Sequence, residues 1–312
     1  MKVIHLHHPY EKTAIEHKPI VLAMGFFDGV HAGHRAVIAQ AKKIADEQGI
    51  SLAVLTYNQH ASIVFKKHDN PIQYLTTLER KLEIFAQLGV EQTYVVDFTS
   101  ALAKLSPADF VEQYMLGLGA VAVVAGFDHT FGPKDTANMH TLPDLAAGRF
   151  EVIEVPPVQY NGEKSASTQA RQLLADGQIK ELNELLVTSY ETSGVIVHGE
   201  ARGREMGFPT LNIETPIDER IPGGGVYVAE VQIADQWYPG MGQIGYNVTF
   251  GDGRPQTVEI NLFDFNDEVY GEHVRVRWYA YLRGEVKFTG MEPLIEQLQL
   301  DETNARQFFK NK

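Results

Sequence analysis

The first half of the chain is organised around the stretch Ile20-Val21-Leu22-Ala23-Met24-Gly25-Phe26-Phe27-Asp28-Gly29-Val30-His31-Ala32-Gly33-His34. Its first five residues are a continuous apolar run, which is typical of a strand covered on both faces of a sheet. Apolar residues then recur at helical spacing as far as Gly49, and glycine commonly follows the last turn of a helix. The stretch therefore predicts a strand, a glycine-rich turn and a helix, in that order.

The turn between this strand and helix fits a phosphate group. The first backbone N–H groups of a helix have no partners within it, and they bind anions readily. His31 and His34 are three residues apart at the helix start, so they project together and can stabilise charge on a leaving group. Phosphate-binding positions are predicted at Gly25, Phe27, Asp28 and Gly33.

The same residues also allow plainer interpretations. The glycines are four residues apart, so neither the dinucleotide fingerprint nor the P-loop pattern with its lysine is met. Asp28 is equally able to cap the helix, and two histidines three residues apart can bind a metal ion. The residue types alone leave these alternatives open.

A resemblance narrows the choice. The ten residues from Gly25 to His34 resemble, nearly residue for residue, the His-x-Gly-His motif of nucleotidyltransferases in the form carried by bacterial FAD synthetases. The resemblance implies that His31 and His34 stabilise charge during adenylyl transfer and do not act as nucleophiles.

The composition narrows the class of protein. A chain of 312 residues is long for one hydrophobic core, so two domains are expected. It has no cysteine, which leaves oxygen and imidazole as metal ligands and suits Mg²⁺ bound with a nucleotide. The net charge of −13 argues against nucleic acid as a partner. No apolar run has the length of a membrane span and the start is too polar for a signal peptide, so a cytoplasmic protein without membrane contact is expected.

Apolar runs alternate with helical patterns throughout the first half, which predicts a parallel α/β sheet whose ligands lie beyond the carboxyl ends of the strands. The segment 126–132, Gly-Phe-Asp-His-Thr-Phe-Gly, follows one such strand. It is either an ordinary loop with a core phenylalanine or part of the site. It resembles the Gly-x-Asn/Asp-x-x-Phe-Gly element of FAD synthetases, which implies that Asp128 and Phe131 contact the flavin or nucleotide and that Asp128 is a candidate metal ligand.

A second segment, 165–171, opens another predicted helix. Hydroxyl and guanidinium groups there can donate to phosphate, although Ser167 or Thr168 can equally serve as a helix cap. The segment resembles the Ser-Ser-Thr-x-x-Arg element of the same family, which implies phosphate binding by Ser167 and Thr168 and a catalytic role for Arg171. Ala166 departs from that pattern, as do Ala61 and Pro133 in theirs.

The pattern of polar and apolar residues changes in the second half of the chain. Residues 176–188 are predicted to form a helical linker, and from 189 onwards strands alternate in polarity between glycine-rich turns, which indicates a small antiparallel barrel. In the last predicted strand, Val274, Val276, Trp278, Ala280 and Leu282 are expected on one face. Apolar residues between 294 and 309 predict a closing helix.

The predicted barrel contains a second group of candidate site residues. Gly199 and Arg204 lie in a turn that can hold phosphates, and Thr210 and Asn212 place two oxygens on one face, as a Mg²⁺ ion shared with a nucleotide requires. Glu259 points away from the core face of its strand, so it is either an exposed charge or a general base. A structural turn explains the first four residues equally well.

These and neighbouring motifs together resemble a riboflavin kinase domain: Gly-Arg-x-x-Gly-Phe-Pro-Thr-x-Asn at 203–212, Gly-Tyr-Asn-x-Thr-Phe-Gly at 245–251, Val-Glu at 258–259, and Asp-Phe-x-x-x-x-Tyr-Gly at 264–271. The resemblance implies that Thr210 and Asn212 bind Mg²⁺, that Glu259 is the base and that Asn247 contacts the flavin or nucleotide.

The order of the two resemblances is that of the bacterial bifunctional riboflavin kinase/FAD synthetase family. It implies FMN adenylyltransferase activity in residues 1–175 and riboflavin kinase activity in residues 189–312, with riboflavin, FMN and ATP as substrates and FAD as a product. Two alternatives remain: only one activity, foremost adenylyl transfer, or a flavin- or nucleotide-binding regulator without turnover. The sequence leaves the oligomeric state open.

Overall fold

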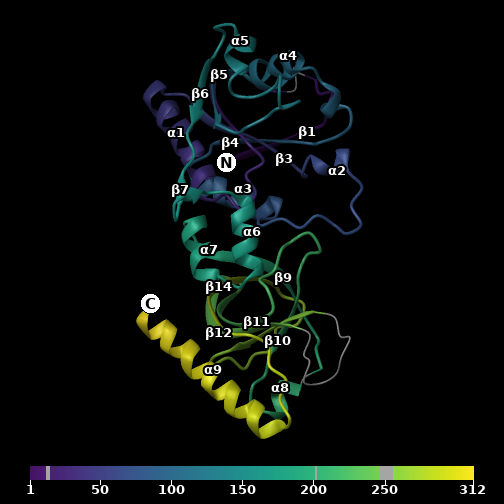
Figure 1. The fold of residues 1–312 in the computed structure, drawn as a ribbon, viewed down its shortest axis with the longest axis vertical. Helices are drawn as coiled ribbons and strands as arrows, with labels where there is room; N and C mark the ends of the chain where they lie inside the picture. Colours follow the sequence, from purple (N-terminus) through teal and green to yellow (C-terminus); the bar gives the residue numbers. More distant parts are fainter. Residues whose placement is uncertain (12–14, 201, 246–255) are drawn as a thin grey trace. The chain divides into compact units, whose positions relative to one another are not determined.

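The computed structural model describes residues 1–11, 15–200, 202–245 and 256–312. The chain forms two compact units (Figure 1). The first contains Met1–Ile72 and Thr77–Ala166, and the second contains Gln73–Thr76 and Ser167–Lys312. Each unit is described by itself below.

The first unit is built on a six-stranded parallel sheet, as predicted. The strand order is β1-β4-β3-β2-β5-β6. The strands are β1 (Lys2–Leu6), β2 (Ile20–Met24), β3 (Ser51–Tyr57), β4 (Gln92–Val96), β5 (Ala120–Gly126) and β6 (Glu151–Val155). All five residues of β2 are buried, because strands on both sides and apolar clusters on both faces cover it.

Helices cover both faces of this sheet. Residues of α1 (Ala32–Gln48) and α3 (Leu78–Gln87) share one apolar cluster, and α4 (Pro107–Phe110) and α5 (Leu142–Ala146) contribute to the cluster on the other face. Helix α1 ends at Gly49, whose φ of 66° is left-handed, as the sequence predicts. The shorter elements are α2 (Ser62–Phe65), η2 (Leu102–Lys104), η3 (Val111–Met115), η4 (Leu116–Leu118) and a hairpin of β7 (Gln159–Tyr160) and β8 (Glu163–Lys164).

The sheet has a topological switch point between β2 and β5. From β2 the chain proceeds to β3 and β4 on one side, whereas β5 and β6 lie on the other. Met24 pairs with Ala125, so the turns that follow the two strands begin next to each other. Open α/β sheets bind ligands at this point, beyond the carboxyl ends of the strands. The fold therefore brings the turns after residues 24 and 126 to one edge of the sheet.

The second unit is built on a closed antiparallel barrel of order β10-β13-β12-β11-β14-β9, again as predicted. The strands are β9 (Tyr190–Val197), β10 (Leu211–Glu214), β11 (Gly225–Ile233), β12 (Gln236–Gly245), β13 (Thr257–Leu262) and β14 (His273–Arg283). The helices of this unit are α6 (Ser167–Ala175), α7 (Ile179–Leu186), α8 (Arg202–Glu205) and α9 (Met291–Asn311).

The predicted alternation along β14 is wrong beyond Trp278. A β-bulge interrupts its pairing with β11, and Tyr279 is the extra residue between the partners of Ala229 and Val228. An inserted residue reverses which face the following side chains occupy. Tyr281 therefore packs with Trp278 around Tyr227, whereas Ala280 belongs to the apolar cluster that includes residues of α9.

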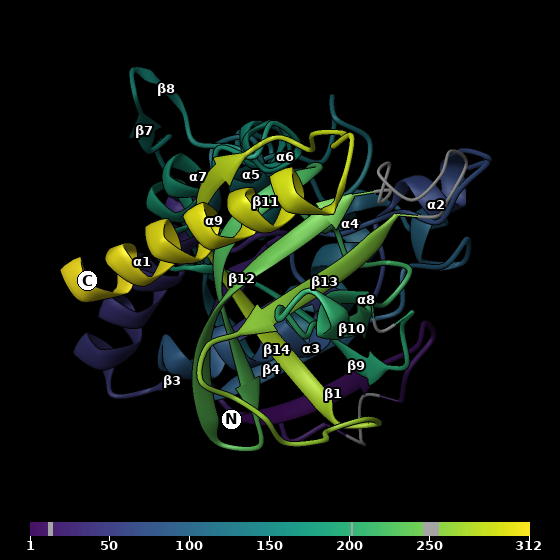
Figure 2. The same ribbon diagram turned by 90° about the horizontal axis from the view of Figure 1, so that it is seen from below.

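Helix α9 lies across barrel strands and closes the unit, as predicted from its apolar spacing (Figure 2). Its anchor is an ion pair in which Arg283 of β14 donates through Nε and Nη2 to Asp301, whose residue is only 2% exposed. A bidentate guanidinium–carboxylate pair fixes geometry as well as charge. The helix is thereby held at a defined position along the strand.

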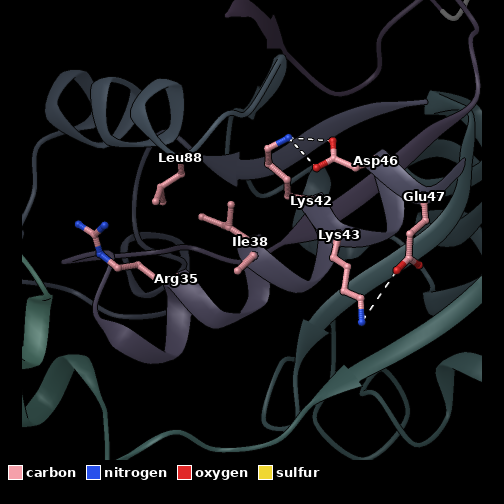
Figure 3. Close-up of a pocket in the computed structure, with 8 residues that line it drawn as sticks. Arg35, Ile38, Lys42, Lys43, Asp46, Glu47 and Leu88 are labelled. Carbon is pink, nitrogen blue, oxygen red and sulfur yellow. Dashed lines mark hydrogen bonds and ion pairs between the residues drawn. The ribbon is translucent and has the colours of Figure 1, made fainter. Parts of the chain in front are cut away.

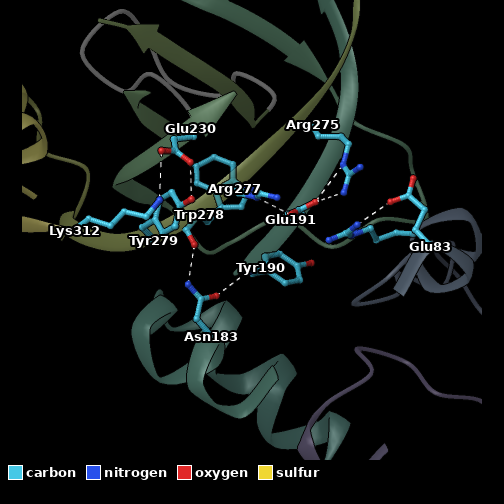
Figure 4. A network of polar contacts seen from close by, with 11 residues as sticks. Glu83, Asn183, Tyr190, Glu191, Glu230, Arg275, Arg277, Trp278, Tyr279 and Lys312 are labelled. Atoms are coloured by element: carbon cyan, nitrogen blue, oxygen red, sulfur yellow. Dashed lines mark hydrogen bonds and ion pairs between the residues drawn. The ribbon is translucent and has the colours of Figure 1, made fainter. Parts of the chain in front are cut away.

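A polar network ties the barrel to α7 (Figure 4). Arg275 and Arg277 of β14 both donate to the carboxylate of Glu191, which is almost completely buried. In the same strand, the carbonyl of Trp278 accepts from the side-chain amide of Asn183 in α7. Because these five residues all lie within the second unit, their contacts support the barrel itself.

Candidate active sites

The turn after β2 has a backbone that few sequences adopt. Phe27 and Val30 have φ values of 58° and 40°, and Gly29 has 83°. Left-handed φ values at a phenylalanine and a valine are strained, and such strain persists only where the surroundings hold it. A Cβ at Gly25 would lie 2.9 Å from the Phe27 ring, so Gly25 is needed for this packing.

Helix α1 starts directly after this turn. His31 occupies the N-cap position without a side-chain capping bond, so the alternative that Asp28 caps the helix is wrong. The carboxylate of Asp28 is buried instead. The first turn of α1 holds no acidic residue, which leaves the positive end of the helix dipole unopposed there. This is the electrostatic setting of an anion site.

The two histidines of the turn form a stacked pair. The ring centroids of His31 and His34 are 3.7 Å apart, and the planes differ by 24°. The rings of Phe27 and His34 meet edge to face, with their centroids 5.2 Å apart. Burial lowers the pKa of His31 to about 4 and the pKa of His34 well below its usual value. Both rings are therefore neutral near pH 7, and each can donate one hydrogen bond.

A buried lysine supports this turn from α3. Nζ of Lys81 donates to the carbonyl oxygen of Phe26 at 2.8 Å and lies 4.3 Å from the centroid of the Phe26 ring. The same carbonyl oxygen accepts from Oγ1 of Thr56. Burial lowers the pKa of Lys81 to about 8, against the opposing effect of the Asp28 carboxylate. The interior of the turn thus holds the ammonium group of Lys81 and the carboxylate of Asp28.

The turn after β5 holds Asp128, which was predicted to contact nucleotide or metal. Its side chain is 59% exposed and forms an ion pair with Lys164, 2.5 Å from Nζ to Oδ2. Nζ of Lys164 also lies 4.6 Å from the centroid of the Phe127 ring. A carboxylate already paired with an ammonium group is a weaker metal ligand than a free one. Phe131 is mostly buried and packs against Phe110 in the core.

The predicted residues Ser167, Thr168 and Arg171 lie in α6, which belongs to the second compact unit. The helix begins at Ser167. Their assignment to phosphate binding stays a prediction.

In the barrel, the structure brings three predicted residues together. Oγ1 of Thr210 donates to Oε2 of Glu259 at 3.3 Å. Asn212 pairs directly with Glu259 across β10 and β13. The neighbouring Val258, Ile260 and Leu262 are buried, as predicted, so Glu259 lies on the other face of β13, together with Thr257 and Asn261. Two neutral oxygen donors and one carboxylate thus converge.

The other residues predicted to belong to the barrel site are Gly199, Arg204 and Asn247. A Cβ at Gly199 would overlap the side-chain amide of Asn212, so this glycine lets the two segments approach. Arg204 donates through Nη2 to the hydroxyl of Tyr270 at 3.1 Å, and the Tyr270 ring stacks on His198. Asn247 lies outside the described residues.

A surface hollow on the first unit lies along α1 (Figure 3). It is lined by residues from Arg35 to Glu47 of α1 and by Leu88. Lys42 pairs with Asp46 and Lys43 with Glu47, both at i,i+4 spacing along the helix. These two pairs offset each other on the surface. Arg35, the third cation of the lining, donates through Nε to the carbonyl oxygen of Val30 at 3.1 Å.

Several residues that contact the candidate site residues were not predicted from the sequence. Thr257 donates through Oγ1 to Oε1 of Glu259 at 3.2 Å, and Asn261 donates to the carbonyl oxygen of Pro209 at 2.7 Å. Ser165 lies within hydrogen-bond distance of His31, and Lys81 holds the turn after β2. Lys81 alone has a signal in the sequence, because its spacing of three and four residues from Leu78 and Phe85 places it on the helix face of these apolar residues, but the sequence does not indicate its partner.

The sequence matches two protein-family models, one over each part of the chain that contains a candidate site. Residues 13–169 match the family model described as FAD synthetase, and residues 186–309 match the model described as riboflavin kinase. A protein of Listeria monocytogenes named bifunctional riboflavin kinase/FMN adenylyltransferase is 44% identical over 309 residues, which cover 99% of this chain and 98% of that protein. The protein of that name from Bacillus subtilis is 40% identical over 313 residues, covering 100% and 99%.

A solved structure from Streptococcus pneumoniae, titled a macrolide-efflux protein, is also similar. The TM-score is 0.89 at 35% identity, and the match covers 98% of this chain and 99% of that chain. Among the described residues, no helix combines the length and apolar character that crossing a membrane requires. With both family models matched in order and near-complete coverage of the named relatives, the chain belongs to the family of bifunctional riboflavin kinase/FMN adenylyltransferases.

Proposed function

We propose that the barrel phosphorylates riboflavin to FMN with ATP, and that the chain then joins FMN to the AMP moiety of a second ATP, giving FAD and pyrophosphate. The observation that carries the proposal is the presence of two chemically different sites in separate compact units. One is a neutral histidine pair at a helix N-terminus, and the other is a carboxylate beside two neutral oxygen donors.

In the kinase reaction, Glu259 accepts the proton of the ribityl hydroxyl while the oxygen of that hydroxyl forms a bond to the γ-phosphorus and ADP leaves. Its two carboxylate oxygens accept from Thr210 and Thr257, which fixes its orientation. Phosphoryl transfer depends mostly on positioning and electrostatics, so a base held in place is sufficient. Gly199 and Arg204 are assigned to the phosphates of ATP.

The barrel residues suit Mg²⁺. Thr210 and Asn212 offer hard, neutral oxygens, and the described residues contain no group of three or more histidine, aspartate or glutamate side chains placed to hold a metal. We therefore assign Thr210 and Asn212 as the residues that would hold a Mg²⁺ ion bound together with the nucleotide. When bound, this ion offsets charge on the phosphate oxygens.

In the adenylyl transfer, an oxygen of the FMN phosphate forms a bond to the α-phosphorus of ATP, and the bond from that phosphorus to the pyrophosphate oxygen breaks. An ionised phosphate needs no strong base as nucleophile. His31 and His34 donate hydrogen bonds to the charge that grows on the phosphates, and the N-terminus of α1 contributes its dipole. Ser167, Thr168 and Arg171 keep their predicted assignment to phosphate binding, Arg171 with a catalytic role.

The remaining assignments follow the same division of the chain into an adenylyl-transfer part and a kinase part. We assign residues 1–175 to adenylyl transfer, 176–188 to the connection and 189–312 to the kinase. Asp128, Phe131 and Asn247 are assigned to flavin or nucleotide contacts, and the protein is placed in the cytoplasm with no nucleic-acid or membrane partner.

The test is product analysis by mass spectrometry. The full chain is incubated with ATP and Mg²⁺, and either riboflavin or FMN. His31→Ala should stop FAD formation and leave FMN formation intact, whereas Glu259→Ala should stop FMN formation and leave FAD formation from supplied FMN. Loss of both activities in either folded variant contradicts the division. A wild-type chain that binds FMN tightly without turnover supports the regulator, and one active substrate alone supports a single-activity enzyme.

A further inference from the structure

The ring of His31 has a partner that the motif does not include. Oγ of Ser165 lies 3.1 Å from Nδ1 of His31, and both residues are buried, at 3% and 5% exposed. The two are 134 positions apart in sequence. A hydrogen bond sheltered from water has a larger effect on ring orientation than an exposed one, because water does not compete for either atom.

The local fold fixes the position of Ser165. Strands β7 and β8 form a hairpin whose turn residues, Asn161 and Gly162, both have positive φ, as a type I′ turn requires. The backbone N–H of Ser165 donates to the carbonyl of Val158 at 2.8 Å just beyond this hairpin. The preceding Lys164 forms the ion pair with Asp128. Two consecutive residues therefore link the hairpin to both glycine-rich turns of the first unit.

The His-x-Gly-His motif leaves room for this contact. A Cβ at Gly33 would lie 3.3 Å from Nδ1 and 3.2 Å from Cε1 of His31, and 3.8 Å from the carbonyl oxygen of Ser165. A larger side chain at position 33 would push against the ring on the side where Ser165 approaches. The glycine thus serves the ring's placement.

A neutral imidazole has one N–H, so its two nitrogens have different tasks. Because burial keeps His31 neutral near pH 7, a phosphate oxygen can be bound only by the nitrogen that carries the proton. If Nδ1 held that proton, it would be used on Ser165, and Nε2 would turn a lone pair towards any anion. If Nδ1 accepts from the hydroxyl, Nε2 carries the proton and remains available as a donor.

We propose that Ser165 is a positioning residue for adenylyl transfer: its hydroxyl donates to Nδ1 of His31 and so maintains the tautomer with the proton on Nε2. This inference rests on the proposed role of His31. Ser165 touches neither reacting phosphate in this scheme and acts through the ring. Ala166, which stands where the FAD synthetase pattern has its first serine, has no hydroxyl for such a bond.

The test compares Ser165→Thr with Ser165→Val in the full chain. The two side chains have nearly the same shape, and only threonine retains the hydroxyl. FAD formation from FMN and MgATP should fall about tenfold in kcat for Ser165→Val, in line with the loss of one buried hydrogen bond, and stay within about twofold for Ser165→Thr. KM for FMN should change little in both variants. Riboflavin phosphorylation by the barrel, measured in the same samples, should be unchanged.

A second readout reports the tautomer directly. In protein labelled with ¹⁵N at histidine, the ring nitrogen shifts should identify Nε2 as the protonated nitrogen of His31, and Ser165→Val should move the population towards the other tautomer. Protonation at Nδ1 in the wild-type chain overturns the inference, as do equal losses of activity in both variants or full activity of Ser165→Val. If His31→Ala retains FAD formation, the proposed role of His31 fails, which is a separate result.

Discussion

Lys81 donates from α3 to the carbonyl oxygen of Phe26, 2.8 Å away, and the lysine is only 3% exposed. This bond joins a helix on one face of the sheet to the turn that carries the histidine pair. The Phe26 carbonyl therefore has a charged partner in the interior, and hydrogen bonds to charged groups are about twice as strong as neutral ones.

Lys81→Met removes this charge while keeping a long apolar side chain. We expect FAD formation to fall by about 10- to 100-fold, because a charge-assisted hydrogen bond to the strained turn is lost. Lys81→Arg should retain more activity, and riboflavin phosphorylation should stay constant in both. Thr56→Val, which removes the neutral donor to the same carbonyl, should have the smaller effect. Wild-type rates of FAD formation in Lys81→Met contradict this role.

Thr257 is expected to affect riboflavin phosphorylation through its hydrogen bond to Glu259. Thr257→Val removes the donor to Oε1 but keeps the shape of the side chain, so riboflavin phosphorylation should fall about five- to tenfold in kcat. Glu259→Gln should cost about 10²- to 10⁴-fold, the usual range for loss of a general base. Thr257→Ser restores the hydroxyl and should recover the rate. Steady-state assays with riboflavin measure these changes, and equal losses in the valine and serine variants would refute them.

Gly199→Ala tests the approach of the segment before α8 to β10. The added methyl group would overlap the side-chain amide of Asn212 and displace it. We expect a higher Mg²⁺ requirement and a lower rate of riboflavin phosphorylation, with FAD formation from FMN unaffected. Gly284→Ala, where the nearest atom to an added Cβ is the Tyr281 hydroxyl at 3.2 Å, is the matched control in the same unit. A Mg²⁺ dependence in Gly199→Ala equal to the control's would contradict the assignment of Asn212.

The first unit should lose stability in acid. Burial lowers the pKa of both His31 and His129 to about 4, so the unfolded chain binds more protons than the folded one between about pH 6.5 and 4. This stabilising contribution is complete above pH 6.5 and is lost as the pH falls through 4. Going from pH 7.5 to 5 should cost about 2 kcal/mol for each histidine.

The two units can be followed separately in this experiment. Both tryptophans, Trp237 and Trp278, lie in the barrel, so their fluorescence reports unfolding of the second unit. Hydrogen exchange of amides in β2 and β5 reports the first. The acid effect should appear in the exchange data and be reduced in His129→Gln. If exchange in the first unit is equally slow at pH 5 and 7.5, after correction for intrinsic rates, the prediction is wrong.

The elements with strong local patterns were predictable from the sequence. The apolar run of β2, the helical spacing of α1 and the alternation of β13 each follow from a single segment, and they suffice to place His31, His34 and Glu259. The resemblance to riboflavin kinases implied roles for Thr210 and Glu259 in one site, and the structure brings the two residues into contact.

The supporting contacts were not predictable, because each joins residues distant in sequence. Lys81 and Phe26 are 55 positions apart, and Ser165 and His31 are 134 apart. The bulge at Tyr279 was missed for another reason. Period-two alternation in β14 is continuous in the sequence, and only the pairing with β11 shows where the register shifts.

The switch point between β2 and β5 also affects how the first unit folds. The two glycine-rich turns become neighbours only after Val21–Met24 and Ala122–Ala125 pair, about a hundred residues apart along the chain. Parallel pairing of such distant segments is slow, because loop closure must precede it. During synthesis, the histidine motif emerges long before its partner strand, so the proposed nucleotide site is complete only once the middle of the chain has joined the sheet.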